Sequence, residues 1–247
     1  MQLRLDKYLA DMGIGTRSQV KQYIRREQVK VNGLLPQGPQ QKVNPEEDEI
    51  TFQGKKVCYL EYEYFMLNKP NGCVSAVTDL RHRTVIDLIT QKNRRDLFPV
   101  GRLDLDTEGL LLITNDGSLT HELLAPGKHV PKTYYAKVEG RVTDEDVRKF
   151  AQGLDIGENK PVLPAELHIL SDETEPSSEK IISEIELTIT EGKFHQVKRM
   201  FEAVGKRVVY LKRVSMGTLK LDESLQPGTY RRLTEAEVNL LKTSHKQ

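Results

Sequence analysis

The sequence predicts an α+β protein with a small N-terminal domain and a larger C-terminal domain. Helical periodicity and a hairpin signal occur within the first 58 residues, and apolar strand patterns alternate with helical ones from residue 64 onwards. The 247 residues are enough for one large core with a small appended domain. We expect domains over residues 1–58 and 64–240, joined by a linker at residues 59–63 after an acidic, proline-containing stretch.

Two short helices are predicted at the start of the chain. Apolar residues recur at spacings of four and three over residues 5–12, which predicts a helix that ends at Gly13. Thr16 and Gln19 are spaced as a capping box, so a second helix should run from there to about residue 27.

A β-hairpin is predicted after these helices. Val29-Lys30-Val31 alternates between apolar and polar residues and leads directly into Asn32-Gly33. This dipeptide favours the tight turns that join antiparallel strands, so Leu34-Leu35 should begin the return strand.

Positive charge is concentrated in two segments, although the formal net charge is only +1. Residues 1–44 carry eight Lys and Arg against three Asp and Glu, and residues 192–232 carry ten against three. Residues 166–191 carry eight acidic residues against one Lys, which masks this excess in the total. The small net charge therefore does not exclude a nucleic-acid partner.

The second predicted helix carries a basic stripe. Arg17, Lys21 and Arg25 recur every four residues, so they lie on one face of the helix. Such a stripe is suited to phosphate groups, which are bound through charge; a solvated helix surface is the alternative interpretation.

From residue 64 onwards, apolar runs bounded by turn residues predict β-strands, and helical spacing predicts short helices between them. The predicted strands are residues 64–67, 110–114, 134–138, 182–190 and 207–211, and the predicted helices are residues 84–90 and 195–204. Residues 171–180 are polar and are expected to form a loop.

Composition excludes several classes of protein. No apolar run approaches the roughly 18 to 20 residues that a membrane helix needs, and the N-terminus has no secretory signal, so we expect a cytoplasmic protein. Cys58 and Cys73 form no CxxC pair and have no His at metal spacing, so we expect structural thiols and no metal site. His82, His121 and His129 also lack ligand spacing and are expected at the surface.

Candidate catalytic carboxylates lie in the run GRLDLDTEGLLLITNDG at residues 101–117. Asp104 and Asp106 occupy a loop that leads into an apolar strand, where a rigid scaffold can present a charged group to a cleft. Asp and Gly are also ordinary turn residues, so composition alone leaves catalysis and a structural loop both open.

Three runs near the N-terminus carry a family resemblance: Arg4-Leu5-Asp6-Lys7-Tyr8-Leu9, Thr16-Arg17-Ser18 and Val29-Lys30-Val31-Asn32-Gly33. Together they resemble the alpha-L RNA-binding domain of a small-subunit ribosomal protein, tyrosyl-tRNA synthetases and several RNA-modifying enzymes. The resemblance implies that cationic side chains of this segment bind RNA, namely Arg4, Lys7, Arg17, Lys21, Arg25 and Lys30.

Further motifs follow in a fixed order along the rest of the chain. They are Asn68-Lys69-Pro70, residues 101–117, Lys132-Thr133-Tyr134, the run EGKFHQVKRMF at residues 191–201, and Pro227-Gly228-Thr229-Tyr230-Arg231. Together they resemble pseudouridine synthases of the small-subunit ribosomal RNA branch, over essentially the whole chain. The resemblance implies a catalytic domain built on a mixed, mainly antiparallel sheet flanked by helices.

The reaction of this family breaks the bond from ribose C1′ to uracil N1, rotates the base, and joins C5 to C1′. No atoms leave, so no cofactor or metal is required. The resemblance makes Asp104 the catalytic carboxylate, acting either as a nucleophile at C1′ or as a base at the C2′ proton. It pairs Lys198 with this carboxylate, whose charged form needs a nearby cation, whereas Asp106 is expected to bond its own loop backbone.

The resemblance also assigns residues that hold the RNA. Tyr134 is expected to stack on the uracil, and Arg102 to contact a phosphate or fill the stack that the extruded uridine leaves. Other residues near the expected cleft are assigned to RNA binding: Lys132, Lys193, His195, Gln196 and Arg199. We expect the partner to be 16S ribosomal RNA within a small-subunit assembly intermediate, and the enzyme to act as a monomer.

Three alternatives remain open on the sequence. One is a synthase that acts on 23S ribosomal RNA, although relatives of that kind often carry a basic C-terminal extension or lack the N-terminal domain. Another is a non-catalytic ribosomal RNA binder or assembly factor, which would share the basic N-terminal domain. The third is a glycoside hydrolase that uses Asp104 and Asp106 as its carboxylate pair, which fits the chemistry at C1′ but not the set of motifs.

Overall fold

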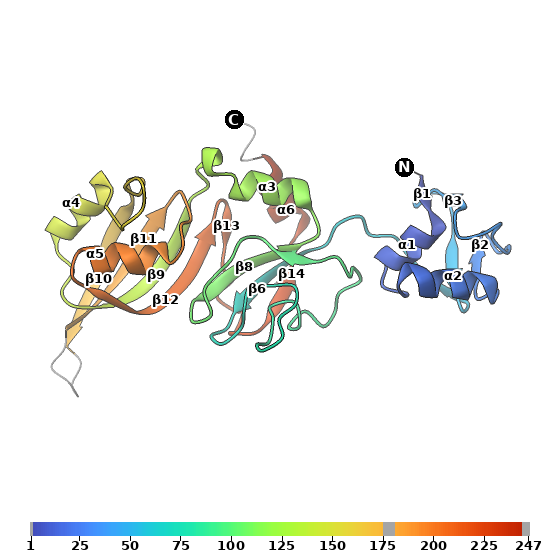
Figure 1. Cartoon of the computed structure of the whole chain (residues 1–247), viewed down its shortest axis with the longest axis horizontal. Coiled ribbons are helices and arrows are strands. Elements are labelled where there is room, and N and C mark those ends of the chain that lie inside the picture. Colours follow the sequence, from blue (N-terminus) through green and yellow to red (C-terminus); the bar gives the residue numbers. More distant parts are fainter. Residues whose placement is uncertain (1, 175–180, 244–247) are drawn as a thin grey trace. The chain divides into compact units, whose positions relative to one another are not determined.

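The computed structural model describes residues 2–174 and 181–243, and the chain forms two compact units (Figure 1). The N-terminal unit contains residues 1–63 and 90–97, and the C-terminal unit contains residues 64–89 and 98–247. The chain therefore passes between the units at three places. Both units mix helices with strands, so the predicted α+β class is confirmed.

The two predicted helices of the N-terminal unit are present. Helix α1 spans Leu5–Asp11 and α2 spans Arg17–Arg25. The capping box at the start of α2 is formed, because the Thr16 hydroxyl accepts from the Gln19 amide while the Gln19 side chain accepts from the Thr16 amide. The apolar faces of both helices pack into one core with the strands of this unit.

The predicted turn of the hairpin is present, but the predicted return strand is not. Asn32-Gly33 forms a tight turn in which Val31 and Leu34 exchange backbone hydrogen bonds, but no ladder follows. Pro36 comes two residues later and has no amide to continue it. Strand β2 (Val29–Val31) pairs instead with β4 (Ile50–Phe52), which pairs with β5 (Lys55–Lys56). A separate ladder joins β1 (Leu3–Arg4) to β3 (Lys42–Val43).

Residues 90–97 are held in the N-terminal unit by buried polar contacts. The Glu63 carboxylate accepts hydrogen bonds from the backbone amides of Asn93 and Arg94. The buried Arg94 guanidinium donates to the Leu60 carbonyl and forms an ion pair with Asp96. These contacts lie at the place where we expected a linker at residues 59–63.

The C-terminal unit is built on one large twisted sheet. Its strands, in chain order, are β6 (Tyr64–Lys69), β7 (Phe98–Pro99), β8 (Glu108–Thr114), β9 (Lys132–Glu139), β10 (Glu166–Thr174), β11 (Ile181–Ile189), β12 (Arg207–Met216), β13 (Leu219–Lys220) and β14 (Tyr230–Arg232). They are ordered β10-β11-β9-β12-β8-β6-β14, with β13 on β12 and β7 on β8. The β12–β8 pair is parallel and the other pairs are antiparallel, as the resemblance implied.

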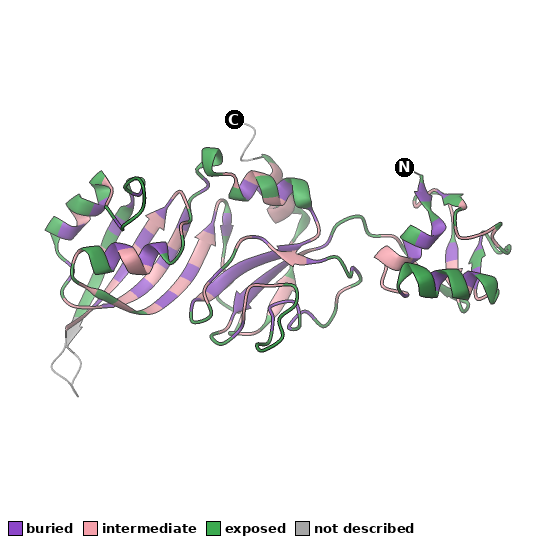
Figure 2. Cartoon of the chain, in the orientation of Figure 1, coloured by how far each residue is buried: buried purple, intermediate pink, exposed green. Residues whose placement is uncertain are grey.

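The two halves of this sheet meet where β8 touches β12. The contact is short, pairing Lys212 with Glu108 and Arg213 with Gly109. Gly109 has a φ of +96°, and a Cβ atom there would lie 2.3 Å from the Arg213 carbonyl oxygen, so only glycine fits. Figure 2 shows β8 buried along nearly all its length, whereas β9 alternates between buried and half-buried residues.

Helices cover the two halves separately (Figure 1). Helices α3 (Gly117–Leu124) and α6 (Glu235–Thr243) pack on β6 and β8 through one apolar cluster. Helices α4 (Asp144–Gln152) and α5 (Gln196–Ala203) belong to the other half, where the tilted rings of Phe150 and Phe201 pack with centroids 4.9 Å apart. A short 3₁₀ helix, Pro126–Lys128, precedes β9.

The five predicted strands and the helix before residue 204 are present, but other predictions fail. Residues 84–90 form a bridge and turns instead of a helix, although their four apolar residues are all buried, so burial here does not follow helical spacing. Of the predicted loop at residues 171–180, the first four residues extend β10, and residues 175–180 lie outside the described residues. Helices α3, α4 and α6 were not predicted.

Candidate active site

An open hollow in the C-terminal unit brings together residues from the loop before β8, from β9 and from the start of α5. It is lined by Arg102, Leu103, Asp104, Thr107, Tyr134, Ile189, Gly192, Lys193, His195, Gln196, Val197, Lys198 and Leu211. The space within it is about 470 Å³, which includes the open solvent at its mouth. The hollow is therefore open to a ligand that approaches from solvent.

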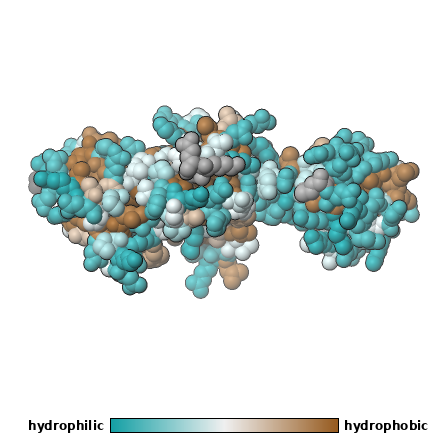
Figure 3. All heavy atoms as spheres, turned by 90° about the horizontal axis from the view of Figure 1, so that it is seen from above, coloured by the Kyte–Doolittle hydropathy of each residue, from teal (hydrophilic) through white to brown (hydrophobic). Residues whose placement is uncertain are grey.

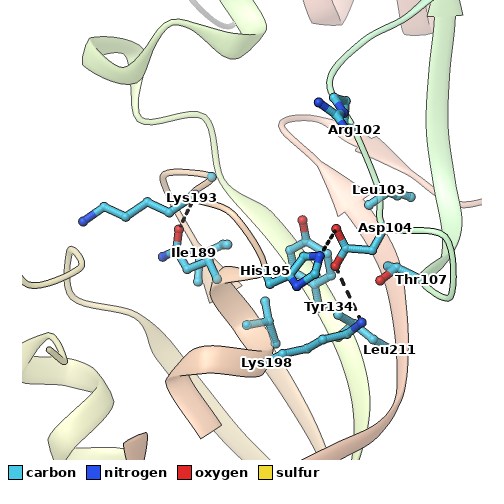
Figure 4. A pocket seen from close by; sticks show the side chains of 13 residues that line it. Arg102, Leu103, Asp104, Thr107, Tyr134, Ile189, Lys193, His195, Lys198 and Leu211 are labelled. Carbon is cyan, nitrogen blue, oxygen red and sulfur yellow. Dashed lines mark hydrogen bonds and ion pairs between the residues drawn. The ribbon is translucent and has the colours of Figure 1, made fainter. Parts of the chain in front are cut away.

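Asp104 lies between two groups that can carry positive charge. Its Oδ1 atom is 3.5 Å from Nε2 of His195, and its Oδ2 atom is 3.7 Å from Nζ of Lys198. Figure 4 shows both side chains pointing toward the carboxylate from α5 and the residue that precedes it. The Asp104 side chain is 29% exposed, so it is screened from bulk solvent and still open to a ligand.

Lys198 binds Asp106 more closely than Asp104. Its Nζ atom donates to both carboxylate oxygens of Asp106, at 2.6 and 2.8 Å. This bond is the main reason why the pKa of Asp106 lies below its usual value; the backbone amide of Asp106 itself contributes less. Asp106 was expected to bond its own loop backbone; that bond is present but minor, and its main partner is Lys198 across the site. One ammonium group serves both carboxylates.

Tyr134 and Arg102 border the hollow in different ways. Tyr134 lies on β9 and is 8% exposed, so its ring forms part of the wall rather than the surface. Arg102 is exposed, and its guanidinium points away from the Asp104 carboxylate in Figure 4. That direction suits a contact with the RNA backbone outside the hollow.

A buried lysine fixes the loop that carries both aspartates. Lys69 is fully buried at the end of β6, and its Nζ atom donates to the carbonyls of Pro70, Leu105 and Thr107. Burial lowers its pKa, and the nearby carboxylates oppose that effect only partly. The sequence motif Asn68-Lys69-Pro70 marked this position but did not assign it to the site. An apolar strand ending in lysine was the signal that could have identified it.

The three remaining residues of the predicted RNA-binding motif bond to their own loop or to residues 156–161. Gln196 is buried, accepts from the Lys193 amide and donates to Glu191. Lys193 donates to the carbonyls of Lys160 and Pro161. Arg199 pairs with Glu158 and donates to the Phe194 carbonyl. Much of the positive charge in residues 192–232 is thus used within the protein, so the charge count overstated the surface available to phosphate.

Lys132 is not at the hollow, although the resemblance assigned it to RNA binding. It is 9% exposed, and its Nζ atom donates to the Val130 carbonyl. Burial lowers its pKa to about 8, with a smaller contribution from the nearby Arg213. A lysine held in this way presents no ammonium group to a phosphate on the surface.

The basic stripe of the N-terminal unit is exposed as predicted. Arg17, Lys21 and Arg25 are all exposed on α2, and none makes a hydrogen bond or ion pair with the described residues. Lys7 and Lys30 are also exposed, whereas Arg4 is bonded through two nitrogens to Asp6. Hydrophilic side chains cover most of this unit on the face seen in Figure 3.

The described part of the chain contains neither a candidate metal site nor a candidate membrane helix. Residues 2–174 and 181–243 contain no group of three or more His, Cys, Asp or Glu arranged to hold a metal ion. The helices of those residues include none long and apolar enough to cross a membrane.

Comparison with known proteins identifies the two parts. A family described as RNA pseudouridylate synthase matches residues 63–203, and the S4 domain family matches residues 3–50. Uncharacterized RNA pseudouridine synthase YtzG of Bacillus subtilis is 47% identical, and the match covers 97% of this chain and 98% of that protein. Ribosomal small subunit pseudouridine synthase A of Haemophilus influenzae is 39% identical, with 97% and 99% covered.

A solved structure agrees with the sequence matches. The crystal structure described as pseudouridylate synthase is 40% identical, with 97% of this chain and 99% of that chain covered at a TM-score of 0.66. The predicted family and the predicted N-terminal RNA-binding domain are both confirmed. The chain belongs to the RNA pseudouridylate synthase family and carries an N-terminal S4 domain.

Proposed function

We propose that the protein isomerises one uridine of 16S ribosomal RNA to pseudouridine, with Asp104 as the catalytic carboxylate. The observation that carries this proposal is the position of Asp104, which lies in an open hollow within 4 Å of both His195 and Lys198. A carboxylate that attacks C1′ or removes the C2′ proton must be ionised. Lys198 supplies an ammonium group beside that charge.

Other residues in and around the hollow bind the RNA or position the catalytic carboxylate. Tyr134 supports the uracil ring as an aromatic wall, because it is buried in β9 and cannot swing away. Lys198 bonds to Asp106 and lies beside Asp104, so its ammonium group offsets part of their negative charge, and Lys69 holds the loop that presents them. Arg102 contacts the RNA backbone after the uridine has been extruded, which itself costs a few kcal/mol. No step in this scheme removes or adds atoms.

The small-subunit target is supported by the named relatives. Ribosomal small subunit pseudouridine synthase A of Haemophilus influenzae and of Escherichia coli align over nearly the whole of both chains. The S4 domain adds a second, basic surface that suits a large folded RNA. We further propose that the enzyme acts as a monomer, in the cytoplasm, on a partly assembled small subunit.

The deciding experiment maps pseudouridines in both ribosomal RNAs from a strain that lacks the gene. We expect one pseudouridine of 16S RNA to disappear and to return when the wild-type gene is supplied. Asp104→Asn should not restore it, although the protein should still bind RNA. Loss of a site in 23S RNA instead would overturn the proposed target, and unchanged maps of both RNAs would overturn the proposed activity.

A further inference from the structure

Phe194 is an exposed aromatic side chain at the edge of the hollow. Its relative exposure is 73%, the largest of any Phe or Tyr among the described residues. It lies between Lys193 and His195, which both line the hollow, yet the reaction scheme above gives it no role. Single exposed apolar side chains are common on protein surfaces, so its position beside the hollow is what makes this ring a candidate contact.

The ring is held in one place. It stacks on the His195 imidazole with centroids 3.8 Å apart and an angle of 18° between the planes. His195 has a left-handed backbone, with φ of 50° and ψ of 32°, a conformation that non-glycine residues adopt at some cost. The turn is braced by Gln196 and by the Arg199 bond to the Phe194 carbonyl. Phe194 is therefore positioned before any ligand arrives.

One face of the ring is covered by His195, so the other face is open. The His195 imidazole lies 3.5 Å from the Asp104 carboxylate, and the Phe194 ring stacks on that imidazole. Phe194 is therefore separated from the reacting sugar by the imidazole ring. The cations beside the ring are already bonded, Lys193 to backbone carbonyls and Arg199 to Glu158. An open aromatic face whose neighbouring Lys and Arg side chains already have hydrogen-bond partners suits a nucleobase rather than a phosphate.

We propose that Phe194 is a stacking platform for an unpaired base next to the target uridine. When the uridine leaves the RNA stack, its neighbour loses a stacking partner, and the Phe194 ring replaces it. This inference rests on the proposed function, because it takes RNA as the substrate and Asp104 as the centre of the site. Stacking accepts every base, so Phe194 adds affinity and position without reading sequence.

The test measures the affinity of the full-length protein for a ribosomal RNA fragment in which the wild type forms pseudouridine. Phe194→Leu should weaken binding about fivefold to about a hundredfold, the effect of removing one aromatic stack on a base. Phe194→Trp should retain the affinity. Leu240→Ala is the matched control, because Leu240 is 55% exposed on α6 and away from the hollow, and it should bind as the wild type does.

A second arm removes the base instead of the ring. Fragments with an abasic nucleotide on either side of the target uridine are bound to the wild type and to Phe194→Leu. At one of the two positions, the abasic change should lower the affinity of the wild type as much as Phe194→Leu does. The same change should not lower the affinity of Phe194→Leu any further. The slope of log affinity against log salt should stay unchanged, because no phosphate contact is removed.

Several results would overturn the stacking role. They are wild-type affinity in Phe194→Leu, additive losses with both abasic fragments, or a reduced salt slope; the last would indicate a phosphate contact. Loss of affinity for another protein, with RNA binding intact, would make Phe194 a protein contact instead. The RNA fragment is one in which the wild-type protein forms pseudouridine, whichever ribosomal RNA it comes from. If that fragment comes from 23S RNA, the 16S proposal is refuted, but the test of Phe194 stays valid.

Discussion

Lys69→Met tests whether a buried lysine controls the catalytic loop from beneath. Methionine has a similar length and fills the same buried space, but it cannot donate to the three carbonyls that Lys69 holds. Two of those carbonyls belong to Leu105 and Thr107, which follow Asp104 in the same loop. The change should therefore affect both the stability of the fold and the position of the carboxylate.

The size of the stability loss follows from these three bonds. The bond to the Thr107 carbonyl is buried, so losing its donor costs about 1–3 kcal/mol of unsatisfied acceptor. The bonds to Pro70 and Leu105 are partly buried, so water can replace the donor and each loss costs about 0.5–1.5 kcal/mol. Methionine also removes the cost of burying an ammonium group, which offsets part of the sum. We expect the free energy of unfolding to fall by about 2–4 kcal/mol.

The pH dependence of this loss has a definite sign. Burial lowers the pKa of Lys69, so the native protein releases its proton at a lower pH than the unfolded chain does. Between that pKa and the ordinary lysine value near 10.4, the unfolded chain binds more protons, and wild-type stability rises with pH. Lys69→Met should lack this rise.

The assay combines urea unfolding from neutral to alkaline pH with single-turnover isomerisation at saturating RNA. A displacement of the loop by about 1 Å should lower the turnover rate about a hundredfold. Lys220→Met, at an exposed position on β13, is the control and should change neither quantity. A Lys69→Met protein with wild-type turnover, or with the small stability change of the control, would refute the role given to Lys69.

Three further predictions address other parts of the molecule. Asp104→Asn should lower the single-turnover rate by at least about 10²–10⁴-fold while Asp106→Asn loses no more than about tenfold; equal losses would leave the assignment between the two aspartates without support. Neutralising Arg17, Lys21 and Arg25 together should reduce the slope of log affinity against log salt by up to roughly three, with turnover at saturating RNA retained, and an unchanged slope would make the stripe a solvated surface. Arg231→Met should destabilise the fold at neutral pH, because hydrogen bonds from Arg231 lower the pKa of Glu237 to about 2, and Ser224 together with Arg231 lowers the pKa of Asp222 to about 2. In acid unfolding, the stability difference from the wild type should disappear between about pH 4 and pH 2, as both carboxylates become protonated. A difference that persists at pH 2 would show that packing is responsible.

Much of the fold could be predicted from the sequence, because the buried residues recur with the period of a strand or of a helix. β9 alternates strictly from Lys132 to Glu139, and α5 presents Val197, Met200 and Phe201 on one buried face. Helix α4 was missed although Thr143 and Asp146 carry a capping-box signal, which the structure forms. β12 was predicted too short, because Lys212 and Arg213 break its apolar pattern. Arg213 is nevertheless buried and donates to the Leu110 carbonyl, a tertiary contact that propensity cannot indicate.

The site was predictable in its residues and not in its contacts. Family motifs brought Asp104, Tyr134 and Lys198 to one hollow, which the structure shows to be their common location. The choice of Lys198 between two carboxylates depends on distances of 2.6 and 3.7 Å, and no spacing in the sequence encodes such a difference. The burial of Lys69 and Lys132 was also hidden, since lysine is ordinarily a surface residue.

The chain passes between the two units three times, and this determines which residues must be exchanged together when the N-terminal unit is replaced. A cut after Glu63 would take away the carboxylate that caps the amides of Asn93 and Arg94, and the Leu60 carbonyl that Arg94 binds. A chimera that exchanges the S4 domain between relatives must therefore transfer residues 90–97 together with residues 1–63, so the unit of inheritance is discontinuous in the gene.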